Sequence, residues 1–159
     1  MDLLKGLSFE LPTRIEYGPG SLSDLGRFLD ELRAKRVLVV SDPGLRSAGV
    51  LSSVLESPGL RGRDVELFEG VSPNPRDVEA EAGAGKARDM GAEALVAVGG
   101  GSVLDCAKAL SVLAPQGGIC HDYEERGSIG PDVLPLIAVP TTAGSGSEVT
   151  FSAVITDSV

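Results

Sequence analysis

The chain has 159 residues, and 14 basic against 23 acidic side chains give it a net charge of -9 at pH 7. Its 42% hydrophobic content is ordinary for a domain with a buried core, whereas the acidic balance argues against duplex DNA or an anionic membrane as a partner. No apolar run approaches the ~20 residues of a membrane span, Met1 begins no recognisable secretory leader, and two cysteines form no disulfide framework, so we expect one cytoplasmic domain.

The N-terminal part predicts alternating helices and strands. The first helix covers residues 21–34, where large apolar side chains recur every three or four positions and therefore lie on one face. A strand follows at 36–40, a second helix at 44–55, and a second strand at 64–69. Both strands are short and rich in Val and Leu, which is typical of strands buried on both faces of a sheet.

A third helix is predicted over residues 75–90. Asn74 is a suitable N-cap for it, and Pro75 suits the first helical position. Gly83 and Gly85 weaken this prediction, since a glycine inside a helix costs about 1 kcal/mol relative to alanine. Small residues on the same helix would instead allow a neighbouring helix to pack closely.

The C-terminal half continues the alternation. Strands are predicted at residues 94–98, 134–139 and 153–156, with a mostly apolar helix at 102–114 and an irregular stretch at 115–131. Strands that alternate with helices favour a single α/β domain with a doubly wound, mostly parallel, Rossmann-like sheet.

A glycine turn at residues 99–102, Gly-Gly-Gly-Ser, joins a predicted strand to a predicted helix. Glycines let a backbone approach a phosphate closely, and the free N–H groups at a helix N-terminus favour an anion. Alternatively, Ser102 only caps the helix, with Asp105 completing a variant capping box; the two interpretations are compatible. The turn is not the usual dinucleotide fingerprint, because Leu104 stands where its last glycine would fall.

A second polar turn follows another apolar strand, at residues 140–148. It carries two glycines, Gly144 and Gly146, and the hydroxyls of Thr141, Thr142, Ser145 and Ser147. Hydroxyl groups at the carboxyl end of a parallel strand lie where open α/β sheets bind ligands. A polar loop without a ligand explains the composition equally well, and neither serine has the spacing of a serine-hydrolase elbow.

Two further positions concern the cofactor and a metal. Asp42 follows the strand at 36–40, where a carboxylate accepts hydrogen bonds from a ribose diol and repels a 2'-phosphate, so NAD is favoured over NADP. A simple turn at Asp42 is an equally good local interpretation. One histidine, His121, and the separated Cys106 and Cys120 cannot supply a histidine-rich centre, so we expect no metal site in this chain.

Taken together, two long segments resemble the iron-containing (group III) alcohol dehydrogenase family, and shorter segments extend this resemblance over nearly the whole chain. The long segments are residues 99–109 and 140–150, and the shorter ones are residues 12–20, 41–42, 73–75 and 154–157. The resemblance implies an N-terminal domain that binds NAD(P). It assigns the cofactor site to Asp42, Asn74, Gly100, Gly101, Ser102, Asp105, Thr141, Thr142, Ser145 and Ser147.

The resemblance also implies roles within this set. The glycines and Ser102 would bind the pyrophosphate, Asp42 would meet the adenosine ribose, and Asn74 would lie near the adenosine half. Asp105 would lie near the nicotinamide and the substrate, and the threonines and the other serines would line the cleft. The reaction implied is hydride transfer between a primary alcohol or aldehyde and the nicotinamide, with a metal as Lewis acid.

The family's iron or zinc ligands, an aspartate and three histidines, come from a helical C-terminal domain that this chain does not match. We therefore expect the chain alone to bind cofactor without turnover. Residues 9–17 match the segment through which the family dimerises, so a homodimer is expected. Alternatives are a non-catalytic interaction module, or the cofactor domain of a glycerol dehydrogenase-like or maleylacetate reductase-like enzyme.

Overall fold

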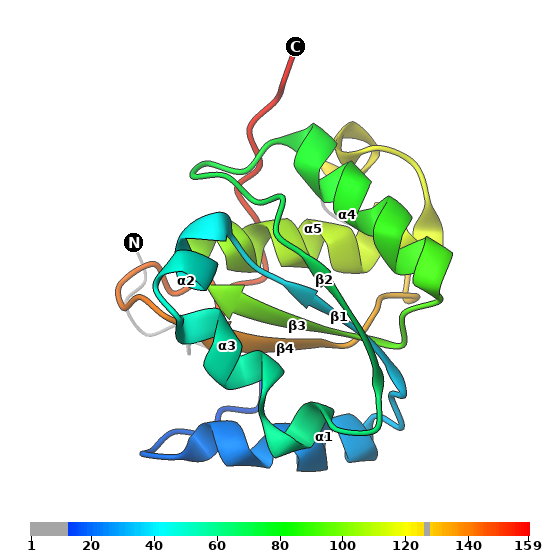
Figure 1. Cartoon of the computed structure of the whole chain (residues 1–159). Coiled ribbons are helices and arrows are strands. Elements are labelled where there is room, and N and C mark those ends of the chain that lie inside the picture. Colours follow the sequence, from blue (N-terminus) through cyan, green and yellow to red (C-terminus); the bar gives the residue numbers. More distant parts are fainter. Residues whose placement is uncertain (1–12, 126–127) are drawn as a thin grey trace, which may run out of the picture.

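Four parallel strands form one sheet at the centre of the molecule (Figure 1). The structure is a computed structural model that describes residues 13–125 and 128–159. The sheet has the order β2-β1-β3-β4 and consists of β1 (Arg36–Val40), β2 (Asp64–Phe68), β3 (Ala94–Gly99) and β4 (Leu136–Pro140). The predicted α/β class and the parallel sheet are thus confirmed.

Helices connect the strands and cover the sheet. The α-helices are α1 (Leu25–Glu31), α2 (Pro43–Ser47), α3 (Val50–Leu55), α4 (Asp77–Met90) and α5 (Gly101–Gln116). The short 3-10 helices are η1 (Ser21–Asp24), η2 (Pro58–Leu60) and η3 (Cys120–Tyr123). Figure 1 shows α4 and α5 on one side of the sheet and α1 and α3 on the other. Within the described part of the chain, no helix is long and apolar enough to cross a bilayer.

Successive side chains of the central strands enter two separate cores. Leu38 and Leu95 pack into the core beneath α4 and α5, whereas Val37, Val39 and Val96 pack into the core above α1 and α3. All five are fully buried. Because β1 and β3 have an apolar layer on both faces, their sequences are almost continuously apolar instead of alternating.

Three predicted helices have other bounds. The helix expected at 21–34 is the 3-10 turn η1 followed by α1, which ends at Glu31. The helix expected at 44–55 divides into α2 and α3, because Gly49 adopts a left-handed conformation, with φ of 75°, between them. The third helix begins at Asp77 and is capped by Arg76, whose backbone N–H donates to Glu79 Oε2 at 3.2 Å. Asn74, the expected cap, lies outside the helix with a left-handed φ of 55°.

Close packing of α4 on α5 explains one of the two glycines inside α4. A Cβ atom added to Gly83 would lie 2.5 Å from Leu110 Cδ1 and 3.1 Å from Phe68 Cε1, so a side chain there would have to displace Leu110. A Cβ on Gly85 would meet nothing nearer than Arg88 Nη2 at 4.0 Å. Glycine at position 83 weakens the helix itself but allows α4 to pack closely against α5.

The C-terminal end differs from the prediction, whereas the structure does not test the dimer segment near the N-terminus. Residues 153–156 form no strand in the described structure; Thr156 instead makes an isolated parallel bridge with Arg76, beside the start of α4. In the dimer segment expected at 9–17, residues 9–12 lie outside the described part, whereas Ile15 and Tyr17 are exposed. The dimer stays a prediction.

Candidate functional site

The candidate site lies at the carboxyl edge of the sheet. The chain moves from β1 to β2 on one side and then crosses to β3 on the other side of β1, so the order of strands reverses between β1 and β3. In open α/β sheets, ligands bind in the crevice beyond such a reversal. β3 ends here at Gly99, and α5 begins two residues later, at Gly101.

The first turn of α5 differs from the predicted cap. Gly100, in extended conformation, holds the N-cap position, and no side chain caps the helix. Ser102 is thus inside the helix, and its expected capping role is wrong. Since the first N–H groups of an α-helix have no partner within the helix, this turn presents backbone donors at the carboxyl edge of the sheet.

The glycine turn contacts the polar loop that follows β4. The Thr141 N–H donates to the Gly99 carbonyl at 3.0 Å. A Cβ on Gly100 would lie 3.0 Å from Thr142 Oγ1. A Cβ on Gly101 would lie 3.0 Å from the Ser145 Cβ and 3.2 Å from Ser147 Oγ. The fold therefore brings together the two segments that the sequence singled out, and a side chain would fill the space between them.

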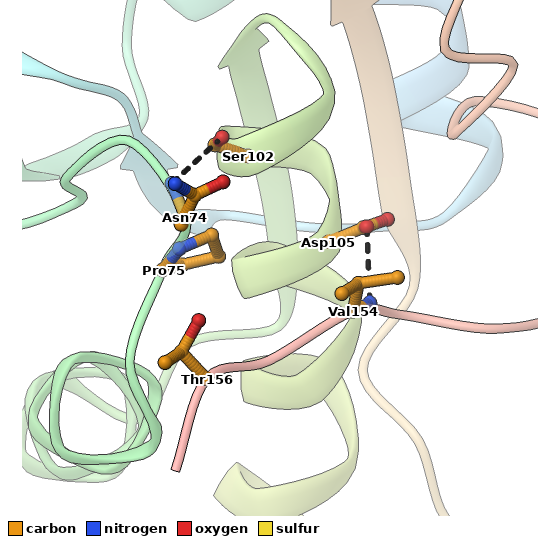
Figure 2. A pocket seen from close by; sticks show the side chains of 6 residues that line it. All are labelled: Asn74, Pro75, Ser102, Asp105, Val154 and Thr156. Atoms are coloured by element: carbon orange, nitrogen blue, oxygen red, sulfur yellow. Dashed lines mark hydrogen bonds between the residues drawn. The ribbon is translucent and has the colours of Figure 1, made fainter. Parts of the chain in front are cut away.

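A small cleft of about 170 Å³ lies beside this turn (Figure 2). On one side the Asn74 N–H donates to Ser102 Oγ at 3.3 Å, and on the other Asp105 meets the backbone of Val154. The lining residues are Asn74, Pro75, Ser102, Asp105, Val154 and Thr156. Asn74, Ser102 and Asp105 were predicted as site residues, whereas nothing in the sequence placed Val154 or Thr156 in a cleft.

Asp105 is held by two protein groups. Its side chain is buried; Oδ1 accepts a hydrogen bond from Lys108 Nζ at 3.1 Å, and Oδ2 accepts one from the Val154 N–H at 3.0 Å. The capping box expected between Ser102 and Asp105 is absent from the described contacts. Sequence reasoning missed Lys108, although its spacing of three residues from Asp105 on one helix is the signal for such a pair.

Asp42 forms the local turn that the sequence allowed. Its Oδ1 accepts a hydrogen bond from the Leu45 N–H at 3.1 Å and so caps α2. The preceding residue, Ser41, is buried and donates from Oγ to the Val98 carbonyl at 2.9 Å, which ties the ends of β1 and β3 together. The contact of Asp42 with a ribose stays a prediction, and Ser41 was missed because its partner is distant in sequence.

Glu148 contributes an unusual acceptor to the polar loop. Its Oε2 atom is buried and, within residues 13–125 and 128–159, is the one buried side-chain oxygen or nitrogen that lacks a hydrogen-bond partner. Buried carboxylate oxygens normally have a donor. The loop therefore favours a donor supplied by a bound group or by further protein.

Asp77, His121 and Asp157 form a cluster of metal-ligating side chains, and their ligand atoms lie within 4.8 Å of one another. His121 Nε2 lies 3.4 Å from Asp157 Oδ2. Asp77 accepts a hydrogen bond from the Val78 N–H at 2.7 Å, and a hydrogen bond from Ser158 lowers the pKa of its carboxyl group. Because Asp77 already accepts hydrogen bonds and the side chains of His121 and Asp157 are exposed, we interpret the cluster as polar contacts between neighbouring side chains.

Comparison with known proteins shows the family. The profile of the iron-containing alcohol dehydrogenases matches residues 12–159. The chain is 38% identical over 151 residues to the NAD-dependent methanol dehydrogenase of Bacillus methanolicus and 42% identical over 153 residues to the choline dehydrogenase of Bacillus subtilis. These alignments cover 95% and 94% of this chain but only 40% and 38% of the relatives, respectively.

Solved structures agree with this result. A 1,3-propanediol oxidoreductase is 34% identical and superimposes with a TM-score of 0.89 over 97% of this chain and 40% of its own. The sulfoacetaldehyde reductase of Bifidobacterium kashiwanohense, solved in complex with NAD+, is 30% identical with a TM-score of 0.85, covering 94% of this chain and 40% of its own. The chain thus spans about two fifths of the length of these relatives, and it belongs to the iron-containing alcohol dehydrogenase family.

Proposed function

We propose that this chain is the NAD(H)-binding domain of a metal-dependent alcohol dehydrogenase. The observation that carries the proposal is the glycine turn at residues 99–102, which lies at the carboxyl end of the central strand β3 and packs directly against the hydroxyl-rich loop after β4. Two segments suited to phosphate binding, residues 99–102 and 140–148, thereby form one surface.

The residues of this surface suit a dinucleotide. Gly100 and Gly101 have no side chain, so the loop after β4 packs directly against them, and the pyrophosphate would bind the backbone donors of the first turn of α5. The hydroxyl of Ser102 faces the same cleft, and those of Thr142 and Ser147 approach the glycines from the opposite side. We assign Asn74, which holds Ser102, to the adenosine side, and Thr141 and Ser145 to the loop that encloses the cofactor.

NAD is proposed over NADP because of Asp42. The cap of α2 uses its Oδ1 atom, and an ionised carboxylate has further acceptor capacity for ribose hydroxyls. A 2'-phosphate at the same place would meet a like charge. The names of two relatives, one an NAD-dependent dehydrogenase and one a reductase solved with NAD+, support the same choice.

For the whole protein we propose reversible hydride transfer between a primary alcohol or aldehyde and the nicotinamide. A bound nicotinamide would accept the hydride from the alcohol carbon, and the hydroxyl proton would leave to solvent. The metal implied by the family does not fit the residues of this chain, which contains one histidine, and that histidine pairs with carboxylates. We therefore assign to this chain cofactor binding without turnover.

A titration of NADH and NADPH into the purified chain, followed by cofactor fluorescence, tests this function. The chain contains no tryptophan that would interfere with the signal. We expect saturable binding of NADH, weaker binding of NADPH, and loss of binding in Gly101→Val, because the added side chain would overlap Ser145 and Ser147. Gly85→Ala, whose Cβ meets open space, is the matched control and should bind as the wild type does.

The result also separates this function from an interaction module. The observation that favours the module is the set of exposed apolar side chains outside the cleft, among them Tyr17 and Phe151. If wild-type chain showed no binding at millimolar NADH, the cofactor function of the isolated chain would be wrong. Capture of a longer relative by the same chain would then support the module.

A further inference from the structure

We propose that Ser41 is a positioning residue for cofactor selection: its hydroxyl fixes the spacing between Asp42 and the glycine turn at residues 99–102, and thereby sets the preference for NADH over NADPH. Ser41 itself would not touch the cofactor, because it is fully buried. The inference rests on the proposed function for its effect on the cofactor, but the link that Ser41 makes can be tested without any ligand.

Ser41 connects three strands at the carboxyl edge of the sheet. It follows β1 directly. Its backbone N–H donates to the Phe68 carbonyl at the end of β2, at 2.9 Å, and its Oγ donates to the Val98 carbonyl of β3, also at 2.9 Å. The residue is 0% exposed, so both hydrogen bonds are shielded from water.

The hydroxyl extends the pairing of β1 and β3 by one position. The last pair in their parallel register is Val40 with Ala97, and Ser41 and Val98 are the next residues of the two segments. A side chain makes the bond at this position, because the backbone N–H of Ser41 donates to β2 instead. From here the chain after β1 enters α2, whereas the chain after β3 enters α5. The hydroxyl therefore joins the two strands where they separate, at the reversal of strand order that marks a ligand crevice.

This link joins two parts of the proposed cofactor site. Asp42, the proposed ribose contact, is the residue after Ser41, and Gly99, which begins the glycine turn, is the residue after Val98. The Asp42 carboxylate is tied to α2 through the Leu45 N–H, but its distance from the turn depends on how the ends of β1 and β3 are joined. A ribose diol and a pyrophosphate are held at a limited separation within one cofactor. A changed spacing between their two binding elements would therefore weaken one of the contacts.

Loss of the hydroxyl would affect the two cofactors unequally. In Ser41→Ala the buried Val98 carbonyl would lose its donor, which is costly in the closed arrangement of the strand ends. If Asp42 then moves relative to the turn, NADH loses hydrogen bonds to its ribose diol, whereas NADPH also escapes part of the repulsion of its 2'-phosphate. A general loss of stability would instead weaken the binding of both cofactors equally. The ratio of the two affinities therefore distinguishes positioning from a merely structural role.

The test is a double-mutant cycle of Ser41→Ala and Asp42→Asn, with Ser57→Ala as the matched control. Ser57 is also a buried serine, and its Oγ accepts the Gly59 N–H at 3.2 Å in the connection between α3 and β2. Two quantities are measured on the full chain. Fluorescence titration gives the affinities for NADH and NADPH, and the NMR chemical shift of the Val98 carbonyl carbon reports the hydrogen bond that its oxygen accepts.

In Ser41→Ala we expect the affinity for NADH to fall about tenfold, and that for NADPH to stay within about twofold, because a contact to a charged group is lost for NADH alone. In the Asp42→Asn background, Ser41→Ala should change the ratio of the affinities by less than about twofold, since both substitutions act through the same carboxylate. The Val98 carbonyl carbon should shift upfield in Ser41→Ala. Ser57→Ala should change neither this shift nor the ratio.

An unchanged Val98 carbonyl shift in Ser41→Ala would overturn the link. An equal loss for both cofactors, a change of ratio that is just as large in the Asp42→Asn background, or equal wild-type affinities for NADH and NADPH would overturn the role in selection. If Ser41→Ala fails to fold, Ser41→Cys keeps a similar shape with a weaker donor and should give smaller changes in the same directions; no change there would also contradict the proposal. Wild-type chain that binds neither cofactor would refute the proposed function and the effect on selection, while the carbonyl shift would still decide the link.

Discussion

The carboxylate of Asp42 carries both a structural contact and a proposed ligand contact, and substitutions can separate the two. Asp42→Asn keeps a good N-cap for α2 but removes the charge. Asp42→Gly removes the charge and the capping side chain, which should lower the free energy of unfolding by roughly a few tenths of a kcal/mol. We expect both variants to raise the affinity for NADPH relative to NADH, as measured by fluorescence titration. If the ratio of the two affinities stayed at the wild-type value in both variants, Asp42 would not select the cofactor.

The two cysteines lead to a prediction about pH. Burial raises the pKa of Cys106 to about 12 and that of the less buried Cys120 to about 11. A thiol with a pKa of about 11 holds roughly 100-fold less thiolate near pH 8 than one with a pKa of 9.0, so alkylation of the native chain should be slow. The alkylation rate of Cys120 should rise about tenfold per pH unit between pH 8 and pH 10.

The raised pKa values of the two thiols also make the stability of the folded chain depend on pH. The folded chain keeps both thiols protonated at pH values above 9.0, the pKa of a thiol in the unfolded chain. Their contribution to the free energy of unfolding is therefore complete below pH 9 and declines as the pH rises toward 11. Chain unfolded in urea is the control, and its alkylation rate should level off above pH 9. A native rate that levels off at the same pH would show that the thiols are not shielded.

Among the elements, α4 offers a matched pair of substitutions two residues apart. Gly85→Ala should raise the free energy of unfolding by about 0.5–1 kcal/mol, because alanine favours the helix and its Cβ meets open space. Gly83→Ala should lower it, because the Cβ would overlap Leu110 and Phe68 and push α4 away from α5. Urea unfolding of both variants measures the difference, and the same sign at both positions would contradict the packing described for α4 and α5.

The four strands of the sheet could be predicted from the sequence, whereas the strand expected at 153–156 is wrong and several helix ends were misplaced. The central strands β1 and β3 are short apolar runs, and that pattern follows directly from burial on both faces. The start of α4 was misplaced because a cap depends on backbone conformation: Asn74 has a left-handed φ and donates its N–H to Ser102 instead. The break at Gly49 likewise depends on a positive φ that composition does not specify.

Part of the candidate site could likewise be predicted from the sequence, and part could not. The meeting of the glycine turn with the loop after β4 follows from the topology, because adjacent parallel strands such as β3 and β4 end at the same edge. The pair of Asp105 and Lys108 is local and has a visible spacing. Its contact with Val154, 49 residues later, requires the path of a segment without regular structure, and no local pattern encodes that path.

At the scale of the whole molecule, the exposed apolar side chains determine how copies of the chain can associate. Tyr17 is 99% exposed and Ile15 is 57% exposed, and both belong to the segment expected to form the dimer. Phe151 is 79% exposed and lies in the segment that Lys108 holds. Exposed apolar side chains of this size mark candidate interfaces, so the two segments are two candidate surfaces for the predicted dimer.

Sedimentation velocity can decide between these faces. We expect the wild-type chain to form dimers that dissociate on dilution, and the double variant Ile15→Ser, Tyr17→Ser to remain a monomer, because it removes the apolar contact of the N-terminal segment. Phe151→Ser removes a comparably exposed aromatic side chain from the other face and should leave the dimer intact. A wild-type chain that is monomeric at every concentration would show that the predicted homodimer is wrong. A dimer that survives the double variant but is lost in Phe151→Ser would instead place the interface at residues 150–154, over the cleft wall, and the NADH affinity of that dimer should then depend on protein concentration.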